Sequence, residues 1–202
     1  MRKVDPDKYQ AKRRQILDAA TACFSRKGFH QTSTAEICAE ADMSPGNLFH
    51  YFASKKAIFA AIVEEEGRQT LAYFDQIQRA EDLFAELLSF MDLILELGSD
   101  QRYLRLSLEI AAEALRDADI GALAAANDKA LQDCLRMLLR NAAVRGQVDP
   151  TLPPADGARW IAALIDGIFN RFAVDPGFEL HRQRDMLRVL LTRFLRPDAA
   201  RA

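Results

Sequence analysis

The hydrophobic positions along the chain follow a helical rhythm. Apolar residues recur at intervals of three and four, and no alternating run is long enough to predict a strand. The first predicted helix covers about residues 8–27 and ends at Gly28, a residue that suits the turn after a helix. Its apolar stripe consists of Ile16, Leu17, Ala20, Cys23 and Phe24.

Residues 33–52 predict two short helices joined by a tight turn. Ser33 and Glu36 fit a capping box, in which the hydroxyl and the carboxylate satisfy two free amides at a helix start. Ser44 is a good N-cap, and Pro45 suits the first position of the second helix. This order of caps, turn and apolar positions indicates a helix-turn-helix.

The second of these helices runs from about residue 46 to residue 52. It turns Leu48 and Phe52 toward the core, and this leaves one set of side chains facing elsewhere: Gly46, Asn47, Phe49, His50 and Tyr51. A short helix with these polar and aromatic side chains can read the major groove of DNA.

Six further helices are predicted, at about residues 54–74, 80–97, 101–115, 119–145, 155–173 and 180–195. The segment 149–154 is the strongest helix breaker in the chain, and Pro197 ends the last helix before a frayed tail at 198–202. The predicted fold class is therefore all-α, with nine helices in two domains. A helix-turn-helix bundle covers residues 1–60, and a larger helical domain covers residues 61–202.

Composition fits a soluble protein of the cytoplasm. Half of the 202 residues are hydrophobic, which is enough for a sizeable core. The longest stretch without Asp, Glu, Lys or Arg, residues 43–54, is too short to span a bilayer, and the first residues lack the apolar segment of a secretory signal. Three widely spaced cysteines favour buried thiols in a reducing compartment over disulfides: Cys23, Cys38 and Cys134.

Charge is distributed unevenly along the chain. Residues 1–60 carry ten Lys and Arg against six Asp and Glu, whereas residues 61–202 carry seventeen against twenty-three. A cationic segment joined to an anionic one suggests that the first part meets a polyanion. The position of this charge on a helix-turn-helix makes DNA the favoured partner.

Most of residues 12–62 resembles the TetR family of transcriptional regulators. The resemblance rests on four stretches in unbroken order: I-L-D-A-A (16–20), F-S-R-K-G-F (24–29), T-S-T-A-E-I (32–37) and A-D-M-S-P-G-N-L-F-H-Y-F-A-S-K-K-A-I-F (41–59). It implies a DNA-binding domain of three helices plus the start of a fourth. It also implies a body that binds an effector and dimerises, and usually repression.

The resemblance and the chemistry of the residues together indicate a set of DNA contacts: Thr32, Ser33, Thr34, Ser44, Pro45, Gly46, Asn47, Phe49, His50, Tyr51, Lys55 and Lys56. Hydroxyls and lysines suit phosphates, which fix register, whereas Asn47 can pair with adenine and Pro45 or Phe49 can touch a thymine methyl. Phe49 lacks the hydroxyl common in the family, and His50 and Tyr51 stand in the reverse of the commoner order. Core packing stays open for Phe49, and pure capping stays open for Thr32 and Ser33.

The body is expected to enclose an effector pocket, because polar residues interrupt its apolar runs near aromatic ones. The candidate lining residues are Phe90, Met91, Tyr103, Arg105, Glu109, Asn127, Trp160, Asp166, Phe169 and Asn170. For each of them, an ordinary core or surface role stays open.

The last two predicted helices are expected to form a homodimer interface. Residues 155–173 carry an apolar band that is too wide for one contact, and the last helix adds a second band. The candidates are Ile161, Ile165, Ile168, Phe172, Leu187, Leu190, Leu191 and Phe194. A two-fold dimer predicts a near-palindromic double-stranded operator.

Little in the sequence predicts catalysis or metal binding. The three histidines are far apart, and H-E-x-x-H, C-x-x-C and a Gly-rich phosphate loop are absent. We therefore expect no cofactor, no metal and no catalytic residue. The favoured interpretation is a TetR-type repressor that an unknown small-molecule effector releases from its operator. Two alternatives stay open: a body that binds a protein partner, and an α-helical enzyme whose first sixty residues only resemble a DNA reader.

Overall fold

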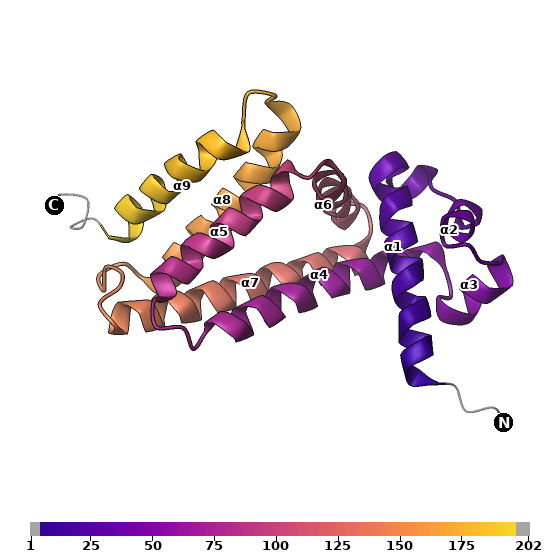
Figure 1. The fold of residues 1–202 in the computed structure, drawn as a ribbon, viewed down its shortest axis with the longest axis horizontal. Coiled ribbons are helices and arrows are strands. Elements are labelled where there is room, and N and C mark those ends of the chain that lie inside the picture. The colour runs from indigo at the N-terminus through magenta and orange to yellow at the C-terminus, as the bar shows by residue number, and fades with distance from the viewer. Residues whose placement is uncertain (1–4, 197–202) are drawn as a thin grey trace. The chain divides into compact units, whose positions relative to one another are not determined.

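The computed structural model describes residues 5–196, and these residues form nine α-helices and no strand (Figure 1). The helices are α1 (Pro6–Gln31), α2 (Thr34–Glu40), α3 (Pro45–Tyr51), α4 (Lys55–Ile77), α5 (Leu83–Ser99), α6 (Gln101–Ala114), α7 (Ala118–Val144), α8 (Pro154–Val174) and α9 (Leu180–Leu195). The predicted fold class is confirmed for this part of the chain. The expected frayed tail at 198–202 lies outside the described residues.

Side-chain caps set the starts of α2 and α3. The Glu36 amide donates to the Ser33 hydroxyl over 3.2 Å, and the Ser33 amide donates to the Glu36 carboxylate over 2.8 Å, which completes the predicted capping box. The Ser44 hydroxyl accepts from the Asn47 amide over 3.3 Å, and Pro45 stands at the start of α3. Since these bonds join residues three apart, the local sequence was sufficient to place both helices.

Gly28 breaks the helical geometry of α1. Its φ of 77° and ψ of 168° lie in a region that residues with a side chain rarely adopt. The first helix was expected to end here, and residues 29–31 form a further turn beyond the break. This turn leads directly into the start of α2.

The chain forms two compact units, and each combines two stretches of sequence. The first unit contains the residues up to Glu66 together with Arg105–Ala124, and the second contains Gly67–Leu104 together with the residues from Ala125 on. The first unit therefore holds the expected DNA-binding segment and adds most of α6 and the start of α7, which the sequence had assigned to the body. Three helices, α4, α6 and α7, continue from one unit into the other.

The core of the first unit joins the first four helices to the end of α6. The expected stripe on α1 is largely buried, and Phe24 contacts Phe59 of α4 edge to face, with 5.2 Å between ring centroids. Leu48 of α3 is fully buried in the same core, and Ile110 of α6 belongs to it as well. Burial of Leu48 fixes which face of α3 turns outward.

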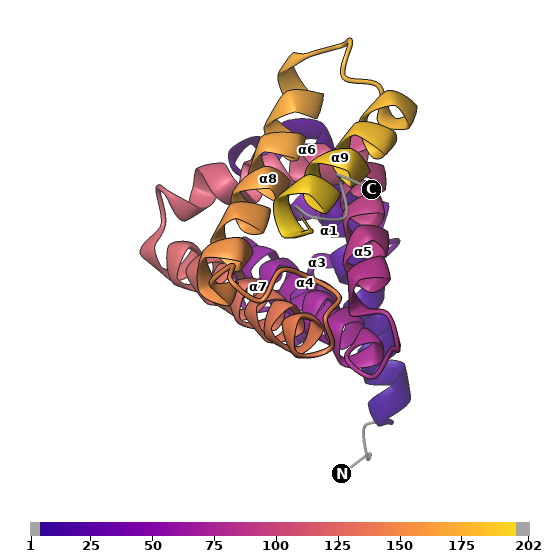
Figure 2. The ribbon, with the colours of Figure 1, turned by 90° about the vertical axis from the view of Figure 1, so that its left-hand side faces the viewer.

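The core of the second unit lies among α5, α7, α8 and α9, and Figure 2 shows α5 beside α8 and α9. Arg184 and Arg188 of α9 form ion pairs with Asp92 of α5, which adds a polar rim to this packing. Several residues expected at a dimer interface belong to this core: Ile161, Ile165, Ile168, Leu187 and Leu191. Since each is at most 8% exposed, these side chains hold the single chain together and offer a partner little surface.

Each helix within residues 5–196 is too short or too polar to cross a lipid bilayer.

Candidate nucleic-acid interface

One face of α3 projects from the first unit. Leu48 is fully buried, whereas Gly46, Asn47 and His50 are exposed and Phe49 is 49% exposed. Phe49 therefore does not pack in the core, which settles that alternative in favour of a surface role. Together with the exposed Ser44 and Pro45, these residues place a continuous set of predicted DNA contacts on the leading end and outer face of one short helix.

Polar side chains of α1 bind the main chain next to α3. The Gln15 amide donates to the main-chain oxygen of Ala41 over 2.7 Å, at the turn between α2 and α3. The Arg13 guanidinium donates to the main-chain oxygen of Tyr51 over 3.3 Å and lies 4.2 Å from the centroid of the Phe52 ring. These contacts hold the turn before α3 and the C-terminal end of α3. Sequence analysis did not assign them, because the bonded residues are 26 and 38 positions apart.

Three aromatic rings meet where α1 begins and α3 ends. Tyr9 lies 4.9 Å from Tyr51 and 6.4 Å from His50, measured between ring centroids, and His50 lies 5.2 Å from Tyr51. Tyr51 is half-buried by this stacking, whereas His50 stays exposed. Tyr9 thus supports two of the predicted DNA contacts. The only sequence signal for this supporting role of Tyr9 is its position one helical turn before Arg13, on the same face of α1.

The residues before α2 use their polar groups within the protein. Thr32 is only 2% exposed, and its hydroxyl donates to the main-chain oxygen of Gly28 over 2.8 Å. Ser33 caps α2 but remains exposed, and Thr34 is half-buried. The Lys27 ammonium, followed by the Ser33 amide and hydroxyl, lowers the pKa of Glu36 from 4.5 to about 2. The capping box therefore carries a fixed negative charge.

The two lysines at the start of α4 also have partners within the first unit. The Lys55 ammonium donates to the main-chain oxygens of Phe29 over 2.6 Å and Thr32 over 2.7 Å, and burial lowers its pKa. The Lys56 ammonium lies 2.7 Å from the Asp117 carboxylate and 2.6 Å from that of Asp119, which raises its pKa. Contact of either lysine with DNA phosphate stays a prediction.

Two carboxylates of α6 bind the turn after Gly28. Glu109 accepts the Phe29 amide over 2.6 Å, which satisfies a donor that the helix break leaves free. The Glu113 carboxylate is 2.9 Å from the His30 ring nitrogen and 2.9 Å from the Arg116 guanidinium, and Glu113 is only 2% exposed. The end of α6 therefore anchors the segment that positions α2. Glu109 was expected to bind effector, and here it has a structural partner.

The other candidate effector residues are spread over the second unit and the end of α6. Phe90 and Met91 are buried in the core, and the Asn127 side chain lies against Gly67, where a Cβ atom would be 2.1 Å from Oδ1. The Tyr103 and Phe169 rings are 5.9 Å apart. The remaining members of the set are exposed: Arg105, Trp160, Asp166 and Asn170. Asn170 lines a groove between α8 and α9, and the ligand role of the whole set stays a prediction.

An apolar surface covers the outer side of α8 and α9. Trp160 is 65% exposed, Met186 61% and Leu190 42%. A groove of about 340 Å³ runs between the two helices, with Phe178, Leu190 and Asn170 in its lining. Of the residues expected at the dimer interface, Leu190 is exposed, and Phe172 and Phe194 are half-buried. The surface open to a partner is therefore shifted toward Trp160 and Met186.

Among the described residues, no three His, Cys, Asp or Glu side chains are grouped as metal ligands.

Two family models match the chain. The model described as "Bacterial regulatory proteins, tetR family" matches residues 16–62, the segment that contains α2 and α3. The model described as "BetI-type transcriptional repressor, C-terminal" matches residues 84–196, which is more than half of the chain.

Relatives and solved structures agree with these matches. The HTH-type transcriptional regulator UidR of Escherichia coli is 29% identical over 79% of this chain and 80% of its own length. The HTH-type transcriptional repressor Rv1474c of Mycobacterium tuberculosis is 30% identical over 86% of this chain and 88% of its own. The structure of Salmonella enterica GusR superimposes with a TM-score of 0.78 at 28% identity, over 92% of this chain and 95% of that one. The structure titled "SmeT-Triclosan complex" gives a TM-score of 0.75 at 26% identity, over 91% and 90% of the two chains.

Proposed function

Because the chain belongs to the TetR family of bacterial transcriptional regulators, we propose that it binds a near-palindromic operator as a dimer and leaves it when a small molecule binds the helical body. The observation that carries the proposal is the outward face of α3. Its buried Leu48 anchors a helix whose exposed side chains are those that a major groove can accept.

We assign direct base contact to Asn47 and Phe49. An asparagine amide can form a bidentate pair with adenine, and an aromatic ring can touch a thymine methyl. Ser33, Ser44, Thr34 and His50 are placed at the phosphates beside that groove. Thr32, Lys55 and Lys56 have their polar groups engaged within the protein, so in this proposal they support the interface more than they touch DNA.

Dimerisation is assigned to the apolar surface of α8 and α9. Trp160, Met186 and Leu190 expose apolar area that a second copy would remove from water. Two-fold symmetry then sets the two α3 helices one DNA turn apart, about 34–36 Å, or a multiple of that distance.

Release by an effector needs a molecule that prefers one of two arrangements of the dimer. A coupling of about 1–3 kcal/mol weakens operator binding about 5- to 150-fold. The solved structure of SmeT, which is similar to this chain, is a complex with triclosan, and this supports a small-molecule site in the body.

Selection from random duplexes, followed by fluorescence anisotropy on the selected sequence, tests the proposal. We expect a near-palindrome, tight binding by the dimer, and weaker binding to a duplex with one scrambled half-site. Binding that shows no sequence preference at any salt concentration would overturn the proposed function.

A further inference from the structure

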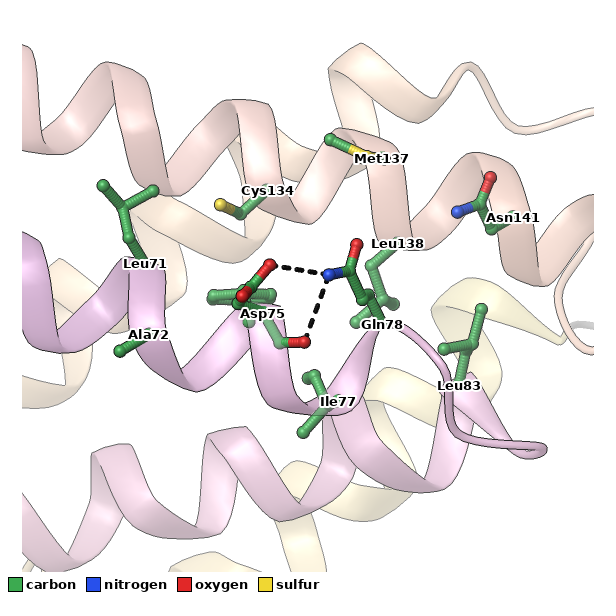
Figure 3. Close-up of a pocket in the computed structure, with 11 residues that line it drawn as sticks. Leu71, Ala72, Asp75, Ile77, Gln78, Leu83, Cys134, Met137, Leu138 and Asn141 are labelled. Carbon is green, nitrogen blue, oxygen red and sulfur yellow. Dashed lines mark hydrogen bonds between the residues drawn. The ribbon is translucent and has the colours of Figure 1, made fainter.

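The second unit contains a groove between the last turns of α4 and the second half of α7 (Figure 3). Its volume is about 380 Å³, within the size range of small-molecule sites. Leu71 and Asp75 of α4 and Gln78 directly after it line one side, and Cys134, Met137 and Asn141 of α7 line the other. Leu83 at the start of α5 closes one end.

Most of the groove surface is apolar and part of it is open to water. Leu71 is 46% exposed and Met137 is 48% exposed, while Phe74 and Leu138 form a buried floor. A ligand with an apolar body would cover both exposed side chains, and burial of apolar area favours binding by about 25 cal/mol per Å². The shape and lining therefore suit a compact hydrophobic molecule.

The polar groups of the groove give it a negative end. Among the described lining residues, Asp75 alone carries a formal charge. The Gln78 amide donates to the Asp75 carboxylate over 2.6 Å and to its main-chain oxygen over 3.1 Å. The last carbonyls of α4 add partial negative charge, because helix dipoles point their negative end to the C-terminus.

The α7 side of the groove contributes no positive charge to balance Asp75. Asn141 offers a neutral amide, and Met137 is apolar. Burial raises the pKa of the Cys134 thiol, which keeps it neutral. An anion would meet Asp75 without compensation, whereas a cation would gain from it.

We propose that this groove binds a lipophilic monocation, with its apolar body between Leu71 and Met137 and its charge beside Asp75. Its role as the effector rests on the proposed function. The site itself does not, because it is defined by the lining residues of the second unit alone.

Two ions of the same shape and opposite charge test the site: tetraphenylphosphonium and tetraphenylborate. Isothermal titration calorimetry of the full chain should show one phosphonium per chain and binding of the borate at least tenfold weaker. Asp75→Asn should weaken phosphonium binding about fivefold, since a partly exposed charge contact is modest in strength. The matched control is Glu64→Gln, an exposed carboxylate on the same helix outside the lining, which should change nothing.

A second variant tests the location independently of charge. Ala72 is exposed and lines the groove, so Ala72→Trp should fill it without disturbing the core. Phosphonium binding should then be lost while the thermal midpoint stays within a few degrees of that of the unmodified chain. Equal binding of both ions, an Asp75→Asn variant with unchanged affinity, or phosphonium binding that survives Ala72→Trp would each overturn the inference.

Operator binding separates this inference from the proposed function. Selective phosphonium binding by a protein that does not bind DNA would remove the proposed function and leave the site. Operator binding without any phosphonium binding would remove the site alone. Phosphonium that binds the groove but leaves operator affinity unchanged would overturn the effector role.

Discussion

Lys55 forms hydrogen bonds with the main chain of its own protein. Its ammonium binds the oxygens of Phe29 and Thr32 and lies 4.4 Å from the centroid of the Phe29 ring. Those oxygens belong to the last turn of α1 and to its C-cap, where the carbonyls have no partner within the helix. The Lys55 side chain thus stabilises the turn between α1 and α2, which leads into the helix-turn-helix.

We predict that Lys55→Met lowers the free energy of unfolding by about 1–3 kcal/mol, because it leaves partly buried carbonyls unsatisfied. Urea denaturation measures the change. The control is Lys56→Met, since Lys56 is 42% exposed and pairs with carboxylates at the surface, so its loss should be at most about 1 kcal/mol. Equal losses in the two variants would contradict the carbonyl role of Lys55.

Glu66 gives the fold a dependence on pH. Burial raises the pKa of its carboxyl from 4.5 to about 7. An acid with a raised pKa in the fold favours folding while it is protonated, so the free energy of unfolding is highest below pH 4.5 and falls as pH rises through about 7. The loss is at most about 3 kcal/mol.

We predict that Glu66→Gln removes this dependence, because the amide stays neutral. Denaturation at about pH 5 and about pH 8 should show a large loss in the unmodified chain and a small one in the variant. If both proteins lose the same free energy, another group is responsible.

At this scale, sequence identified surface chemistry better than internal contacts. The exposed positions of α3 follow from the helical period, since Leu48 and Phe52 had to turn inward. The burial of Thr32 and the hydrogen bonds of Lys55 could not be predicted from the helical period. They depend on a turn whose direction is fixed by Gly28 and by residues far along the chain.

The turn between α1 and α2 depends on one glycine and on the end of α6. The Glu109 carboxylate lies over Gly28, so that a Cβ atom there would be 3.0 Å from Oε1. The backbone angles of Gly28 are also unfavourable for any residue with a side chain. Geometry and contact therefore both require glycine.

We predict that Gly28→Ala lowers the free energy of unfolding by about 1–3 kcal/mol and weakens operator binding. Gly46→Ala is the control for stability, because it is helical and a Cβ atom there meets nothing within 4 Å. That variant should unfold at an equal or higher temperature. Unchanged stability of Gly28→Ala would contradict the role of Glu109 as a close cover.

Helix positions were largely predictable, and the grouping of helices was not. Proline, glycine and capping residues act over three or four positions, so they appear directly in the sequence, and α9 was placed at 180–195 as observed. The bond from Phe29 to Glu109 spans 80 positions, and periodicity contains no information about it. The assignment of the end of α6 to the first unit therefore required the structure.

At the scale of the whole molecule, the exposed apolar surface of α8 and α9 sets the expected assembly. We predict that Leu190→Glu converts a dimer to monomers, because it places a charge on that surface. Sedimentation measures the mass, and operator affinity should fall at least tenfold. Leu115→Glu is the control, since Leu115 is 91% exposed in the turn after α6. A Leu190→Glu protein that stays dimeric would show that another surface joins the subunits.

Sequence could not separate the exposed apolar residues of α8 from the buried ones. Apolar positions on α8 predict a buried face, but periodicity cannot separate burial within one chain from burial between two. Ile161 and Trp160 are neighbours in sequence, and one is fully buried while the other is 65% exposed.

The inclusion of residues 105–124 in the first unit changes its charge balance. Residues 1–66 and 105–124 together carry twelve Lys and Arg against thirteen Asp and Glu, although residues 1–60 alone are cationic. A unit with this balance exerts little long-range attraction on an arbitrary duplex, so contacts of individual side chains must supply most of its affinity for DNA. Competition from the rest of the chromosome is correspondingly weak, and occupancy of the correct site depends on fit more than on attraction.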